Sequence, residues 1–157
     1  MSNTQNINPK QSLSINGEPA PLAEFNQDTF LQSNKKTTTD YRAAFAQAIG
    51  TTGTIAKIVK MAFGTAGEVD EQGNPAPPTD NGSLNNVVLT KNIKEVTYPV
   101  ETSVCFEAEI EAGEYTGAIN EVALIDEEEQ TAAKMRLLTS KGVDAESGAI
   151  FKWTVEF

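Results

Sequence analysis

The sequence has no histidine and only one cysteine, Cys105. Histidine is the commonest general base and the commonest transition-metal ligand, so its absence removes the usual routes to acid–base catalysis and zinc binding. A lone cysteine cannot form an internal disulfide, which agrees with folding in a reducing cytoplasm. We therefore expect a chain that is not an enzyme, with no catalytic residue, no metal site and no cofactor.

Positive charge is also scarce, because 12 Lys and Arg stand against 22 Asp and Glu, a formal net charge of -10. Phosphate backbones and anionic bilayers repel such a chain, so we expect neither nucleic acid nor a membrane as a partner. The longest apolar run, Val122 to Ile125, is far shorter than the ~20 residues that a membrane helix needs. The first thirty residues lack the basic start and apolar core of a signal peptide, and we expect synthesis in the cytoplasm.

The composition changes near residue 38. Residues 1–38 are rich in Asn, Gln, Ser, Thr and Pro, and their scattered apolar residues follow no period of 2 or 3.6. Such a segment cannot offset its own ordering entropy, so it is either a disordered tail or an extended arm that docks on a neighbouring subunit. Phe25, Phe30 and Leu31 favour the arm, because solvated tails usually lack aromatic residues. We predict that residues 39–157 form a single β-rich domain.

The clearest helix signal follows Asp40, a good N-cap residue. The apolar residues after it recur at helical spacing and form one stripe: Tyr41, Ala44, Phe45, Ala48 and Ile49. Gly50 can then end the helix in a left-handed conformation. A helix of about nine residues is marginal alone, so this stripe must pack either against a sheet of its own chain or against copies of itself.

From residue 54 onward the pattern predicts strands. We expect them at residues 54–63, 87–96, 104–110, 118–126, 131–138 and 151–157. In the third strand Cys105, Glu107 and Glu109 alternate with apolar residues, which indicates one buried and one solvent-facing side. The acidic run Glu127 to Gln130 is interpreted as a hairpin turn, because it lacks the oxygen spacing and the glycine of a calcium loop. The predicted fold is mainly β: an antiparallel β-sandwich with one N-terminal amphipathic helix and an extended N-terminal arm.

A long loop interrupts the strands at residues 64–83, which are rich in Gly, Asp and Asn and contain Pro75, Pro77 and Pro78. Loops of this length inside a compact domain are usually functional. The prolines restrict the backbone, which lowers the entropy lost when a partner orders it. We therefore predict that the loop is a contact surface and that its three prolines are candidate partner contacts.

The order of these segments resembles a known family. The strand Ile55 to Gly64 leads into the Gly- and Pro-rich loop, Ser83 to Leu89 follows, and Gly117 to Asp126 contains E-V-A-L-I-D before the hairpin turn. Over residues 39–157 this order is similar to the N-terminal domain of phage tail-collar fibre proteins. Asn86 stands where the family pattern has Glu, and it completes the set of candidate contacts.

The resemblance implies a domain that fixes a trimeric fibre to the baseplate of a contractile tail or a related injection machine. Fibre proteins continue into a shaft and a receptor-binding tip, whereas this chain stops at Phe157, so we expect the attachment module alone. The implied partners are copies of the chain itself, in a homotrimer, and other tail or baseplate proteins. The implied location is the virion tail or injection-machine particle, after synthesis in the bacterial host cytoplasm.

Two other classes of protein are also compatible with the sequence. One is a different virion structural protein, such as a tail-tube, tail-terminator or decoration subunit, which would form a ring or lattice of a different mass. The other is a carbohydrate-binding module, which needs an exposed aromatic platform. Its candidates are Trp153, Tyr41, Tyr98 and Tyr115, of which Trp153 lies on the apolar face of the last predicted strand.

Overall fold

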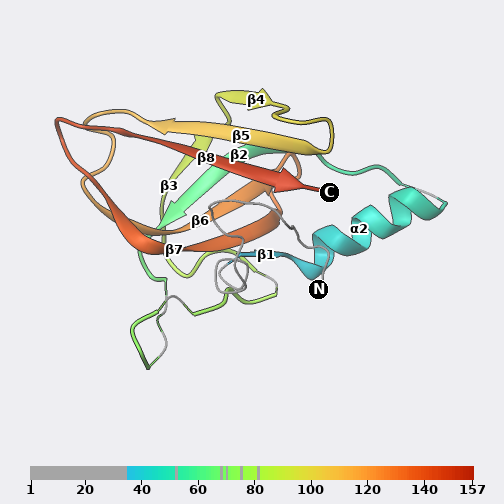
Figure 1. The fold of residues 1–157 in the computed structure, drawn as a ribbon, viewed down its shortest axis with the longest axis horizontal. Helices are drawn as coiled ribbons and strands as arrows, with labels where there is room; N and C mark the ends of the chain where they lie inside the picture. Colours follow the sequence, from blue (N-terminus) through green and yellow to red (C-terminus); the bar gives the residue numbers. More distant parts are fainter. Residues whose placement is uncertain (1–34, 52, 68, 70, 75, 81) are drawn as a thin grey trace.

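The structure is a computed structural model that describes residues 35–51, 53–67, 69, 71–74, 76–80 and 82–157. It is mainly β, with two antiparallel sheets and one helix (Figure 1), which confirms the predicted class. The elements are β1 Lys35–Thr37, α2 Thr39–Gly50, β2 Ile58–Gly64, β3 Val87–Asn92, β4 Glu95–Thr97, β5 Ser103–Ile110, β6 Gly117–Asp126, β7 Thr131–Val143 and β8 Ala149–Glu156.

The strands are divided between a five-stranded sheet, in the order β1-β7-β6-β2-β3, and a three-stranded sheet, in the order β4-β5-β8. The single strand predicted at residues 87–96 is wrong, because the chain changes sheets in its middle. The amide of Ile93 donates to the carbonyl of Val59 in β2, whereas the amide of Lys94 donates to the carbonyl of Glu107 in β5. The strand predicted from residue 54 begins only at Ile58.

One apolar core joins the two sheets. The five-stranded sheet contributes Met61, Phe63, Val122 and Leu124, and the three-stranded sheet contributes Phe106, Ala108, Ile110 and Trp153. The rings of Phe63 and Phe151 meet across the core with centroids 4.7 Å apart. Each large side chain buried in this way stabilises the fold by about 1.5–3 kcal/mol, so the core holds the two sheets together.

The opposite face of the five-stranded sheet is also covered. Ala62, Leu84 and Ala123 form a second buried cluster, in which Leu84 comes from the long segment between β2 and β3. Consecutive residues 121–124 of β6 are therefore buried on both faces. This explains why the sequence of β6 is a continuous apolar run and does not alternate.

Helix α2 begins two residues earlier than the sequence indicated, and its N-cap is Thr38. The predicted N-cap Asp40 is wrong: it lies in the first turn, where its charge suits the helix dipole. The hydroxyl of Thr38 accepts the amide of Tyr41 at 3.2 Å and donates to the carbonyl of Thr131 at 2.9 Å. Because β1 pairs with β7, residues 35–38 belong to the folded part, and the helix projects from one end of the sheets (Figure 1).

Two further expectations concern single sites in the sheets. The predicted hairpin turn between β6 and β7 is confirmed, and the Asp126 carboxylate closes it by accepting the amides of Glu128 at 2.8 Å and Gln130 at 2.9 Å. The predicted solvent exposure of Cys105 is wrong, since its side chain is buried. β5 is the central strand of its sheet, so Thr97 and Thr154 flank this small side chain on both sides.

Candidate functional site

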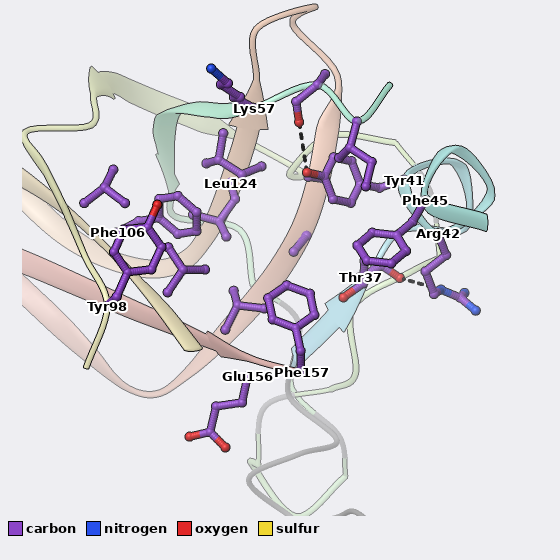
Figure 2. Close-up of a pocket in the computed structure, with 18 residues that line it drawn as sticks. Thr37, Tyr41, Arg42, Phe45, Lys57, Tyr98, Phe106, Leu124, Glu156 and Phe157 are labelled. Atoms are coloured by element: carbon purple, nitrogen blue, oxygen red, sulfur yellow. Dashed lines mark hydrogen bonds between the residues drawn. The ribbon is translucent and has the colours of Figure 1, made fainter. Parts of the chain in front are cut away.

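An open apolar cavity of about 740 Å³ lies between α2, the segment that precedes β2, and the ends of β4, β5 and β8 (Figure 2). Phe106 and Leu124, which belong to the core, form part of its wall, so the cavity is the open end of the space between the two sheets. The lining is apolar except for Thr37, Arg42, Lys57 and Glu156. An apolar cavity of this size is in the range of ~300–1,000 Å³ that protein binding pockets occupy.

The apolar stripe of α2 forms one wall of this cavity. Tyr41 and Phe45 point into it, and the hydroxyl of Tyr41 donates to the carbonyl of Ala56 at 2.9 Å (Figure 2). Burial and the negative charge of Asp126 raise the pKa of Tyr41, so the hydroxyl stays protonated and remains a donor at neutral pH. The ring of Phe45 stacks on that of Phe157, with centroids 6.1 Å apart.

The stripe is nevertheless incompletely covered. Its first four residues are half-buried, as the periodicity predicts, but none of the twelve residues of α2 is buried. Ile49 is 71% exposed and Phe157 is 76% exposed. A helix this short depends on packing for its stability, and contiguous exposed apolar surface marks a contact site. The predicted packing of the stripe is therefore only partly satisfied by the described residues.

The apolar surface continues along the edge strand β4. Val96 and Tyr98 line the cavity, and they are 42% and 72% exposed. Val100, in the turn that follows, is 59% exposed. We refer to the cavity together with Ile49, Phe157 and these three residues as the apolar site.

The charges at the apolar site lie at its rim. Arg42 is held in place because its Nε donates to the carbonyl of Thr37 at 3.2 Å. Lys57 is fixed through its backbone, since its amide donates to the Glu127 carboxylate at 3.0 Å. In Figure 2 the carboxylate of Glu156 points away from the cavity. The rim thus carries two cations and one anion around an uncharged interior.

A second arrangement of polar groups lies beneath the long loop. Glu121, with 0% exposure, accepts the backbone amides of Asn86 at 3.1 Å and of Asn85 and Ala66 at 3.4 Å each. The Arg136 guanidinium lies 3.8 Å from the same carboxylate. A buried charge must be paired and hydrogen-bonded, and here the loop backbone supplies most of the partners. Glu121 therefore anchors both ends of the loop to β6.

Two glycines permit this close approach. A Cβ atom on Gly64 would lie 2.6 Å from a carboxylate oxygen of Glu121 and 2.7 Å from the carbonyl oxygen of Asn86. The amide of Gly67 donates to the side-chain oxygen of Asn120 at 2.9 Å. The loop backbone thus lies directly on β6.

The middle of the loop is fixed at the other edge of the sheet. The Lys134 ammonium donates to the Thr79 hydroxyl at 2.5 Å, and Lys36 pairs with Asp80 at 2.9 Å. The hydrogen bond from Lys36 lowers the pKa of Asp80, which keeps that carboxylate charged near neutral pH. The loop therefore crosses the sheet to β1 and β7, and residues 71–74 are its longest exposed run among the described residues.

The candidate contacts from the sequence fall into three groups. Phe25, Phe30, Leu31 and Pro75 lie outside the described residues. Pro77 is exposed, whereas Pro78 is buried. The Asn86 side chain donates to the Thr65 hydroxyl at 2.8 Å within the loop itself. Pro77, Pro78 and Asn86 do not lie at the apolar site. That each of them contacts a partner stays a prediction.

The sequence reasoning did not find the anchoring role of Glu121, although an acidic residue next to the apolar run of β6 was a usable signal. It also did not find the cavity, because the lining residues come from seven separate segments: 37–45, 55–58, 96–98, 104–106, 124, 132–133 and 155–157. In the described part of the chain, no group of three His, Cys, Asp or Glu residues is placed to hold a metal ion. The described helix is too short and too polar to cross a membrane.

Comparison of the chain with protein-family models and with curated protein sequences found no match.

Proposed function

We propose that this protein is a structural component of a phage tail or of a phage-tail-like contractile injection machine. In this role it acts as a fibre-attachment or baseplate-peripheral module, and copies of the chain associate as a homotrimer. In this proposal its two sheets form a rigid antiparallel β-sandwich, and none of its residues catalyses a reaction. The observation that carries the proposal is the apolar site, which the described residues of the chain leave open.

Support for assembly comes from exposure and packing. Tyr98 and Phe157 line the cavity and are 72% and 76% exposed, and Ile49, on the helix that forms one wall of the cavity, is 71% exposed. Exposed apolar surface of this kind is typical of interfaces, whose centres are enriched in aromatic side chains and depleted in charge. The charges of the site are confined to its rim, which is the usual pattern of an interface.

Support for a place in a tail comes from the sequence resemblance to tail-collar fibre proteins. Its most specific segment, E-V-A-L-I-D, begins at Glu121, and Glu121 is the carboxylate that anchors the long loop. The segment thus has a definite structural task, since it forms the core strand and holds the loop. The net charge of -10 further favours protein partners over nucleic acid.

Two measurements test the proposal. Light scattering of the purified full-length chain should give a mass near three times 16.9 kDa as the concentration rises. Mass spectrometry of purified tail or injection particles from the source should find the chain in stoichiometric amounts. A chain that stays monomeric at every concentration and is missing from particles would refute the proposal. A larger ring in solution would instead support a tail-tube or terminator subunit.

The carbohydrate-binding alternative receives little support. Trp153 is 6% exposed and belongs to the core, so it cannot form a sugar platform. Of the other three candidate rings, Tyr41 and Tyr115 are half-buried, and Tyr98 is exposed at 72%. We therefore retain assembly as the proposed function.

A further inference from the structure

We infer that the apolar site receives residues 22–31 of a neighbouring copy of the same chain. The inference rests on the proposed function, because it names the segment through which the copies associate. Residues 22–31 read Leu-Ala-Glu-Phe-Asn-Gln-Asp-Thr-Phe-Leu, with four large apolar side chains in ten positions.

The first argument is the match in chemistry between the segment and the site. The cavity of about 740 Å³ is open and apolar, and no side chain of the described residues fills it. An apolar wall left in contact with water is unfavourable, at roughly 25 cal/mol for each Å². Phe25, Phe30 and Leu31 are apolar groups of the size that such a cavity accepts, and they cannot form a core of their own.

The second argument is charge. Residues 22–31 contain Glu24 and Asp28 and no basic residue. The rim of the site carries two cations, Arg42 and Lys57, and one anion, Glu156, and in Figure 2 the charged groups of all three point outward from the cavity. An acidic apolar segment therefore meets a site that is apolar inside and carries more positive than negative charge at its edge, which is the complementarity that selects a partner.

The third argument concerns where the chain enters the folded part. β1 starts at Lys35 and runs toward α2, and Thr37 already lines the cavity. Leu31 precedes Lys35 by four residues, a span of at most ~14 Å. To reach the site of its own chain, the segment would have to reverse direction within these few residues. A neighbouring copy can present the same segment without a reversal.

A photo-cross-linking experiment on the full-length chain tests the inference directly. Phe30 is replaced by a photoreactive benzoyl-phenylalanine, the sample is irradiated, and mass spectrometry identifies the linked residues. We expect a product of twice the chain mass, linked to Tyr41, Phe45, Ile55 or Phe157. A product of single-chain mass linked to these residues would mean that each chain binds its own segment, and the inference would be wrong. Cross-links elsewhere, or none, would also overturn it.

A pair of substitutions separates this inference from the proposed function. In the full-length chain, Phe25→Ser with Phe30→Ser should weaken self-association at least about tenfold, because buried aromatic anchors carry most of the energy of an interface. The control is Ile7→Ser with Ile15→Ser, which removes apolar residues of the arm outside the segment and should leave the mass unchanged. If the wild type is a trimer and the first variant is equally trimeric, the inference fails while the proposed function stands. A wild type that is monomeric at every concentration and is missing from particles would refute the proposed function itself.

Discussion

At the scale of single residues, the long loop depends on one buried carboxylate and one glycine. Glu121 holds backbone amides from both ends of the loop, and Gly64 leaves the space that this contact requires. Neither residue is near the apolar site, so both can be tested through stability alone. Each has a matched control elsewhere in the chain.

Replacing Glu121 by Gln should destabilise the fold by about 3–5 kcal/mol, because it leaves the buried Arg136 without its charged partner. Glu128→Gln, in the exposed β6–β7 turn, should change stability by less than about 0.5 kcal/mol. Urea unfolding of the full-length variants measures both. Equal midpoints for the two variants would show that the buried pair contributes nothing to the fold.

Replacing Gly64 by Ala should cost about 1–3 kcal/mol, since the new methyl group would overlap a carboxylate oxygen and a backbone carbonyl. Gly142→Ala is the control, because a Cβ there meets nothing within 4 Å. The two melting temperatures should differ by several degrees. A Gly64→Ala variant as stable as the Gly142→Ala variant would mean that the loop can shift away from β6 without loss.

At the scale of elements, α2 and the long loop are both attached to the sheets by a few specific contacts. Thr38 connects the start of α2 to β7. Lys36, Lys134 and Glu121 connect the loop to three strands of the five-stranded sheet. The loop is therefore a covering layer of the sheet and not a free connection.

Thr38→Ala should destabilise the chain by about 1–2 kcal/mol, because it removes the N-cap of α2 and a buried hydroxyl contact to β7. Asp40→Ala should cost less, since Asp40 only supplies a charge in the first turn, worth about 0.3–1 kcal/mol. Circular dichroism during thermal unfolding compares the two variants. A larger effect at Asp40 would contradict the assignment of the cap.

Deletion of residues 71–74, an exposed run of the loop, should change stability by no more than about 1 kcal/mol, because closure entropy varies slowly with loop length. Replacing residues 65–85 by a short turn should have a much larger effect. That replacement uncovers Ala62 and Ala123 and removes the amides that satisfy Glu121. Differential scanning calorimetry of the two variants tests this contrast, and similar melting temperatures would argue against a covering role.

At the scale of the whole molecule, the apolar site is the feature that the described residues leave open. The core between the sheets opens into this cavity at Phe106 and Leu124, and the far face of the five-stranded sheet is covered at Ala62 and Ala123 by Leu84 of the loop. Among the described residues, the end that carries α2, Phe157 and the edge of β4 combines a cavity with strongly exposed apolar side chains. Assembly through this end would bury that surface.

Ile49→Ser should therefore weaken self-association of the full-length chain several-fold while changing its unfolding midpoint little, because Ile49 is 71% exposed within one chain. Ile150→Ser is the control, since Ile150 is 56% exposed on β8 and is not part of the apolar site. Sedimentation velocity across a range of concentrations measures the association. Equal weakening by both variants would mean that exposed apolar area in general drives association, whichever end carries it.

The sequence by itself determined the mainly β class, the stripe of α2 and the acidic hairpin turn after β6. These follow from local periodicity and turn chemistry, because a side chain's direction is set by its own backbone. Only the tertiary structure decided that residues 87–96 divide between two sheets, that Cys105 is buried and that Glu121 holds the loop. These outcomes depend on partners far along the chain: Glu121 lies 35 residues from Asn86, and Thr38 lies 93 residues from Thr131. The cavity is of the same kind, since its walls meet only when both sheets and α2 are in place.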